Sequence, residues 1–97
     1  MANQAQWHVT FKQVAQYGTI HYLEVEQSAE IKFSWEFGGG GVIVMIFSPP
    51  AASWDKDYPW AAGRRNQIIE RVAQEAVRQQ APRSRYEIES DGTINIR

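Results

Sequence analysis

The stretch that decides the fold is residues 30–47, which read EIKFSWEFGGGGVIVMIF. Apolar and polar side chains alternate over 30–37, which predicts a strand with one buried face, because successive side chains of a strand point to opposite sides. The run 42–47 is apolar on both faces and is therefore expected in the centre of a sheet. Glycines 38–41 separate the two runs and predict an antiparallel hairpin, because glycine adopts positive φ angles at little cost.

Two further strands are expected before this hairpin. Residues 7–14 alternate at first between apolar and polar side chains, and residues 19–26 are rich in β-forming residues. Tyr17-Gly18 is expected to form the turn between them. Residues 1–6 are expected to be a disordered tail.

A helix is expected after the hairpin, over residues 60–80. One apolar stripe recurs there at helical period, and Pro82 marks the end of the helix. The stripe consists of Ile68, Ile69, Val72, Ala73, Ala76 and Val77. Residues 49–60 contain three prolines and are expected to be irregular.

The last residues predict a second hairpin. A two-residue loop would divide its apolar residues between both faces of the sheet. A three-residue loop over 90–92 sets Ile88 opposite Ile94 and Tyr86 opposite Ile96, so that all four share one face. The glycine that ends this loop suits the left-handed position that the loop requires, and the three-residue form is therefore predicted.

Together these elements predict an α+β fold over 1–97, taken as a single domain. One apolar helical stripe needs one sheet face to cover, which favours a two-layer sandwich. The expected sheet has five or six mainly antiparallel strands, in the order β-β-β-β-α-β-β.

Composition restricts the classes of partner. The chain has 97 residues, no cysteine and a net charge of −1. Absence of cysteine favours a reducing, cytoplasmic location. The longest apolar run has six residues, far short of the roughly 20 that a membrane helix needs, so no membrane partner is expected. A modest arginine excess in the second part of the chain is too small to favour nucleic-acid binding.

Cofactor and metal motifs are weak. The glycine run leads into a strand, whereas a phosphate-binding loop leads into a helix, so a hairpin is favoured over a phosphate site. His8 and His21 lie on separate predicted strands without the three or four ligands of a zinc site. No cofactor, metal or catalytic residue is therefore predicted, and the protein is expected not to be an enzyme.

The segment before the helix carries the candidate binding residues. Asp55 and Asp57 could contact a partner, but the favoured hypothesis is that they pair with Arg64 and Arg65. Those arginines are expected in the first turn of the helix, where cations oppose the helix dipole.

Three aromatic residues of the same segment, Trp54, Tyr58 and Trp60, belong to residue types enriched at interfaces. The alternative, that their rings fold back over the core, is equally favoured. Trp7, Phe33, Trp35 and Phe37 are expected in the core rather than around a ligand cavity.

One longer pattern resembles the small immunity proteins of bacterial polymorphic toxin systems. It runs over residues 17–89 and consists of Gly18, Tyr22-x-Glu24, Ile31-x-Phe33-x-Trp35-Glu36, a glycine-rich turn, Val42-Ile43, Trp54, Tyr58-Pro59, Ile68-Ile69-Glu70 and Tyr86-x-Ile88-Glu89. The resemblance implies a cytoplasmic, non-enzymatic protein that neutralises a toxin domain by binding it.

Three functions remain open on this basis. The first is a protein-binding module whose contact residues are Trp54, Asp55, Asp57, Tyr58 and Trp60, with an immunity protein as one form of it. The second is a homodimer or subunit of a larger assembly, joined through the helix or through a sheet edge at 19–26 or at the terminal hairpin. The third is a small-ligand-binding domain with a pocket under the aromatic strands.

Overall fold

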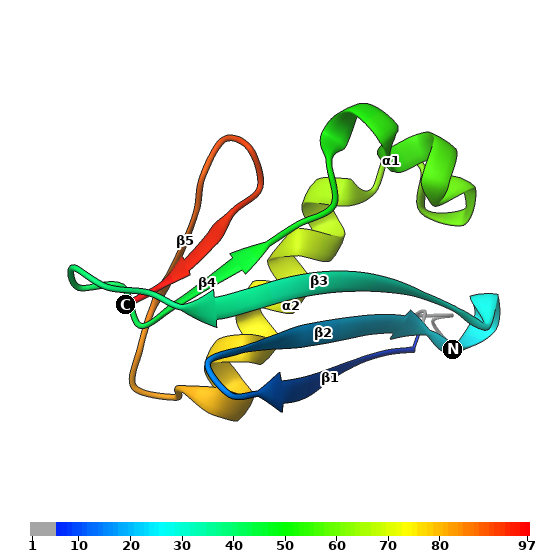
Figure 1. Cartoon of the computed structure of the whole chain (residues 1–97). Helices are drawn as coiled ribbons and strands as arrows, with labels where there is room; N and C mark the ends of the chain where they lie inside the picture. Colours follow the sequence, from blue (N-terminus) through cyan, green and yellow to red (C-terminus); the bar gives the residue numbers. More distant parts are fainter. Residues whose placement is uncertain (1–5) are drawn as a thin grey trace.

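The computed structural model describes residues 6–97 as one six-stranded antiparallel sheet with α2 packed against one face (Figure 1). The predicted α+β fold is confirmed. The strand order is β1-β2-β3-β4-β6-β5. The strands are β1 (Trp7–Val14), β2 (Tyr17–Glu24), β3 (Ala29–Phe37), β4 (Val44–Phe47), β5 (Tyr86–Ile88) and β6 (Ile94–Ile96). The helices are α1 (Ala51–Asp57) and α2 (Arg65–Gln80), with short 3-10 turns η1 (Val25–Gln27) and η2 (Pro59–Ala61).

The expected tail over 1–6 falls almost entirely outside the described residues. Gln6 alone is described, and its carbonyl accepts a hydrogen bond from the Val25 N–H at 3.0 Å.

The turn between β1 and β2 differs from the prediction. It is formed by Ala15 and Gln16, and Tyr17 and Gly18 belong to β2. Ala15 adopts a φ of +58° there, a conformation for which glycine is the usual signal, so the sequence pointed to the wrong pair.

Gly18 is required for side-chain packing across the sheet and not for the turn between β1 and β2. Its partner across the sheet is Trp35, whose indole Nε1 donates to the Lys12 carbonyl at 3.2 Å. A Cβ on Gly18 would lie 1.9 Å from that carbonyl oxygen and 2.7 Å from the indole nitrogen. The glycine therefore lets the Trp35 ring cross β2 and reach β1.

The glycine hairpin is confirmed. β3 and β4 pair antiparallel, with Phe37 opposite Val44, and Gly40 and Gly41 adopt positive φ angles. β4 lies between β3 and β6, in the interior of the sheet as expected.

The terminal hairpin has the predicted register. Tyr86 lies opposite Ile96 and Ile88 opposite Ile94, and Gly92 ends the three-residue loop with a φ of +96°. β6 inserts beside β4, which leaves β1 and β5 as the two edges. The expectation of an edge at 19–26 is therefore wrong, because β2 pairs with β1 on one side and with β3 on the other.

The core lies between α2 and the sheet. The predicted stripe of α2 is buried from Ile68 to Ala76, and it packs on one face of the strands. The buried strand side chains are Val9, Ile20, Tyr22, Ile31, Phe33, Trp35, Ile46, Ile94 and Ile96.

Phe37 was expected in this core but is 46% exposed, and Trp7 is half-buried. Phe37 lies at the end of β3, beside the C-terminal end of α2. The residues of that part of the chain that line the same groove are the small Ala76 and Ala81 and the polar Gln80, so the Phe37 ring is only partly covered.

The segment expected to be irregular is helical. α1 and η2 occupy it, and Gly63 at a φ of +75° then separates η2 from α2, which begins at Arg65 and not at 60. Seven residues are too few to display a helical period in the sequence. No helix among residues 6–97 is both long and apolar enough to cross a bilayer.

Candidate functional site

Residues 51–63, called the helical lobe below, project from one end of the molecule (Figure 1). The lobe is closed on itself around Trp54, which is 1% exposed and donates its indole N–H to the Ala61 carbonyl at 2.9 Å. The Trp54 ring also contacts the Tyr58 ring, with centroids 5.1 Å apart. A buried hydrogen-bonded ring makes the lobe a rigid unit and not a loose connection.

The five predicted contact residues are thus divided between the core and the surface. Trp54 is in the core, so its side chain is not available to a partner in this conformation. Tyr58 and Trp60 are half-buried and pack against the core, whereas Asp55 and Asp57 are exposed. The exposed charged residues of the helical lobe are therefore Asp55, Lys56 and Asp57, and Tyr58 and Trp60 stay partly exposed.

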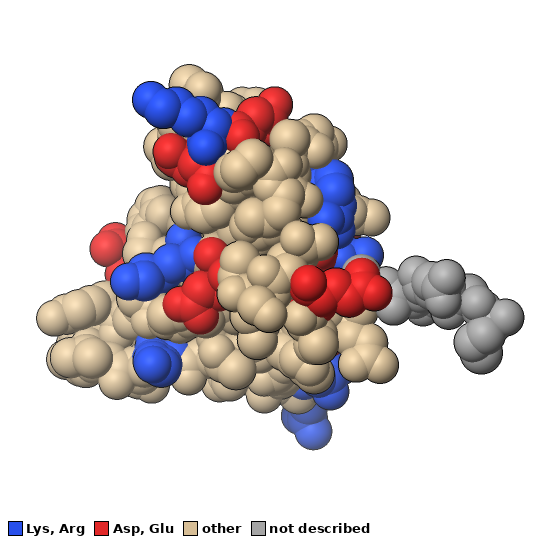
Figure 2. All heavy atoms as spheres, turned by 90° about the vertical axis from the view of Figure 1, so that its right-hand side faces the viewer, with Lys and Arg blue, Asp and Glu red and all other residues tan. Residues whose placement is uncertain are grey.

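The predicted pairing of Asp55 and Asp57 with Arg64 and Arg65 is wrong. Asp55 Oδ1 accepts the Gly63 N–H at 3.0 Å, and no ion pair within residues 6–97 involves either aspartate. The two arginines are engaged elsewhere, since each reaches an acceptor far away in the sequence. Figure 2 shows acidic and basic side chains mixed on the face that bears the helical lobe.

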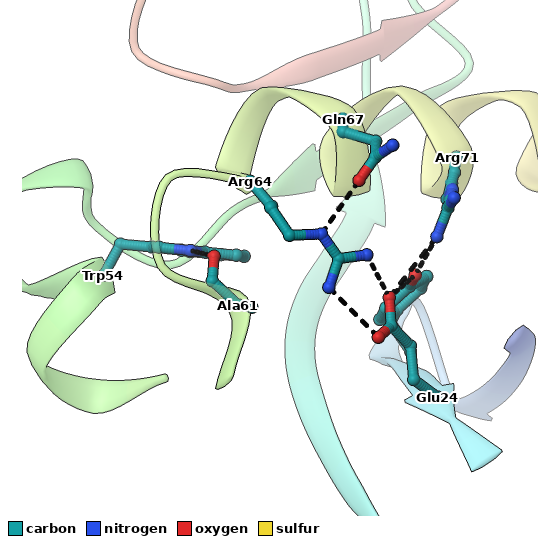
Figure 3. Close-up of polar contacts among 7 residues, drawn as sticks. Glu24, Trp54, Ala61, Arg64, Gln67 and Arg71 are labelled. Atoms are coloured by element: carbon teal, nitrogen blue, oxygen red, sulfur yellow. Dashed lines mark hydrogen bonds and ion pairs between the residues drawn. The ribbon is translucent and has the colours of Figure 1, made fainter. Parts of the chain in front are cut away.

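Arg64 binds Glu24, which lies at the end of β2 and is only 2% exposed (Figure 3). Its Nη1 and Nη2 donate to the two carboxylate oxygens at 3.1 and 2.5 Å, and its Nε donates to Gln67 at 3.0 Å. This two-pronged geometry is the strongest that arginine makes with a carboxylate. It joins the start of α2 to β2.

Arg71 completes the cluster about two turns further along α2, seven residues after Arg64. Its Nη1 lies 3.3 Å from Glu24 Oε2 and donates to the Tyr22 hydroxyl at 2.7 Å, and that hydroxyl donates to Glu24 at 2.6 Å. The Arg71 guanidinium also stacks over the Trp7 ring at 5.2 Å, which adds a cation–π contact. This cluster could not be predicted from the sequence, because its members lie up to 64 positions apart.

The electrostatics of the cluster follow from burial and pairing. Burial by itself raises the pKa of the Glu24 carboxyl, but hydrogen bonds from Arg64 and Tyr22 outweigh burial and hold the pKa below its ordinary value. Burial and the neighbouring carboxylate raise the pKa of the Tyr22 hydroxyl to about 12. Glu24 is thus a charged, fully bonded group that docks α2 on the sheet.

Arg65 is also used structurally. Its Nε and Nη2 donate to the Pro49 carbonyl at 3.0 and 2.9 Å, and Nη2 also donates to the Asp91 carbonyl at 2.8 Å. One side chain therefore holds the entry to the helical lobe against the β5–β6 loop.

The two histidines lie apart. His8 is exposed on β1, and the His21 Nδ1 lies 3.0 Å from Glu30 Oε1 across β2 and β3. Within residues 6–97 no group of three or more His, Cys, Asp or Glu side chains could hold a metal ion.

A groove of about 280 Å³ opens where the sheet extends past the end of α2. Trp35, Phe37 and Ile43 contribute to its apolar lining, with Lys12 and Gln80 among its polar residues. The hypothesis of a ligand pocket under the aromatic strands therefore has a physical location, at the lower end of the range of small-molecule sites.

Comparison with known proteins gives no relative for this chain: no family model, no curated protein and no solved structure matches it.

Proposed function

We propose that this chain is a non-enzymatic protein-binding module that contacts a basic surface of its partner through the helical lobe. The observation that carries this proposal is the separation of Asp55 and Asp57 from the arginines expected to neutralise them. Arg64 is committed to Glu24 and Arg65 to two carbonyl groups. Lys56 lies between the two aspartates in the sequence, but no ion pair within residues 6–97 involves it or either carboxylate.

The rigidity of the helical lobe supports the same proposal. Its backbone is already ordered by the Trp54 indole and by hydrogen bonds such as Tyr58 N–H to the Trp54 carbonyl at 2.8 Å. A surface that is ordered before binding loses less conformational entropy in the complex. Tyr58 and Trp60 remain partly exposed in the same lobe, and they belong to residue types that anchor interfaces.

The resemblance of residues 17–89 to immunity proteins gives this proposal its specific form. In that form the partner is a toxin domain with a basic surface, binding neutralises it, and both proteins act in the cytoplasm.

The partner can be identified by photo-cross-linking in the native host, from position 57 and, as a control, from position 36. Glu36 is an exposed acid on β3, and no ion pair in the described part of the chain involves it. A protein captured from position 57 and not from position 36 is then purified, and its affinity is measured by calorimetry.

Asp57→Lys is expected to weaken binding by about tenfold or more, whereas Glu36→Lys, with the same change in charge, leaves the affinity within about twofold. Affinity of the unmodified protein should also fall as salt concentration rises. Equal affinities for the two variants would exclude the helical lobe as the contact surface. A partner whose toxicity is unaffected by co-expression of this chain would exclude the immunity form while leaving the binding module intact.

A further inference from the structure

The exposed edge of β1 carries a second, separate feature. β1 is eight residues long, whereas the opposite edge strand β5 has three residues. An edge strand of this length presents a row of backbone N–H and C=O groups that can pair with another strand. In Figure 1 it lies at the opposite side of the molecule from α1.

Strand register identifies which β1 groups point outward. Val14 and Tyr17 flank a two-residue loop and therefore form a hydrogen-bonded pair, and such pairs alternate along an antiparallel ladder. Even-numbered residues from His8 to Val14 thus bond to β2. Odd-numbered residues from Trp7 to Gln13 direct their backbone groups to the edge.

Two observed hydrogen bonds agree with this parity. The carbonyl of Gln6, an even position, accepts from Val25 on the β2 side. The carbonyl of Val9, an odd position, accepts from the side chain of Gln79 on α2, at 3.4 Å. Within residues 6–97, Gln79 is the residue whose side chain forms a hydrogen bond with the outward-facing backbone groups of β1.

A hollow of about 400 Å³ runs beside the same edge. It lies between the Trp7–Thr10 part of β1 and the Glu75, Arg78 and Gln79 side chains of α2. An edge strand next to a helix flank is an arrangement into which an extended segment can add as a further strand.

The charges along β1 indicate what such a segment should carry. The exposed side chains on its outer face are His8, Thr10, Lys12 and Val14, none of them acidic. In an added antiparallel strand these even positions would fall in the non-hydrogen-bonded pairs, in which facing side chains are closest. A carboxylate opposite Lys12, and another four residues away opposite His8, would therefore be favourable.

From this geometry we infer that the β1 edge binds an extended segment of another protein, with acidic side chains four residues apart on one face and apolar side chains on the other. A second copy of β1 fits less well. In the antiparallel registers that satisfy the edge groups, even positions face even positions. Lys12 then lies opposite Gln6, His8, Thr10, Lys12 or Val14 of the other copy, and none of these residues is acidic.

The probe for this inference is the peptide Val-Glu-Val-Thr-Val-Glu-Val, with blocked ends, against the version that has lysine in place of both glutamates. Backbone hydrogen exchange of the full chain is measured by NMR with and without peptide. The amides of Trp7, Val9 and Phe11 are expected to gain protection on binding. The amides of Thr10 and Lys12 already bond to β2 and should not change.

Charge reversal provides the matched control. The glutamate peptide is expected to bind about tenfold more tightly than the lysine peptide, and Lys12→Glu should reverse this preference. Lys32→Glu makes the same change on an exposed side chain of β3, away from the edge, and should leave the preference unchanged.

Unprotected odd-numbered amides at saturating peptide, or equal affinity for both peptides, would overturn the inference. Protection that increases with protein concentration alone, together with a dimer in sedimentation, would assign the edge to a second copy instead. None of these outcomes depends on the helical lobe, so this surface and the proposed function are tested independently.

Discussion

Replacing Glu24 by glutamine is expected to destabilise the protein by about 3 kcal/mol, although the side chain changes by a single atom. The carboxylate accepts both prongs of Arg64 and the Tyr22 hydroxyl while only 2% exposed. Removing one partner of a buried ion pair generally costs about 3–5 kcal/mol. The lower end applies because Arg64 and Arg71 remain 31% and 22% exposed and can turn toward water.

Urea unfolding followed by tryptophan fluorescence measures this loss, and thermal unfolding should show a melting temperature lower by about 12 °C or more. The pH dependence provides a second readout. The pKa of Glu24 is lower in the folded protein than in the unfolded chain, so its stabilisation is present above about pH 4.3 and is lost as pH falls. The difference between the two proteins should therefore shrink between pH 7 and pH 3.

Glu75→Gln is the matched control. Glu75 also binds an arginine, Arg78, but that arginine is 68% exposed on α2, so the exchange should cost about 0.5 kcal/mol or less. If Glu24→Gln costs no more than this control, or if the difference between Glu24→Gln and the unmodified protein does not depend on pH, the buried cluster does not dock α2 as described.

Three further substitutions test the backbone and the helical lobe by the same unfolding assay. Gly18→Ala should lower the free energy of unfolding by about 3 kcal/mol, because the added Cβ would lie 1.9 Å from the Lys12 carbonyl oxygen. Gly39→Ala is the control and should be close to neutral, since its Cβ meets no atom within 4 Å. Similar costs for both would contradict the role given to Gly18. Ala15→Gly should stabilise by about 1 kcal/mol by relieving the positive φ, and a destabilised variant would count against that turn. Trp54→Phe should cost about 2 kcal/mol through a lost buried hydrogen bond and lost volume, and a neutral exchange would show that the lobe does not depend on this ring.

Side-chain alternation was enough to predict most of the sheet. The register of the terminal hairpin followed from parity alone, since only one loop length places Tyr86, Ile88, Ile94 and Ile96 on one face. The helix stripe was equally clear because the apolar positions repeat over ten residues. Strong periodic patterns are local and therefore visible in a sequence.

The predictions that failed concern contacts between residues that are far apart in the sequence. The sequence pairs Arg64 and Arg65 with the acids just before the helix, but the fold brings Glu24 and the Pro49 carbonyl to them instead. The turn at Ala15 contains no glycine, and the nearby Gly18 is required instead for a tertiary contact with Trp35. Neither contact can be predicted until the strand order is known.

The position of β6 affects the order in which this chain can complete its fold. β4 is made early, but one of its two neighbours is β6, so residues 94–96 must be synthesised before the interior of the sheet is closed. Until then Val44, Met45 and Ile46 form an apolar strand with one open side, which is the kind of segment that associates between chains. A nascent or truncated chain lacking 94–96 should therefore be prone to aggregation and dependent on chaperones, even though the strands β1–β3 pair with near neighbours and can form without delay.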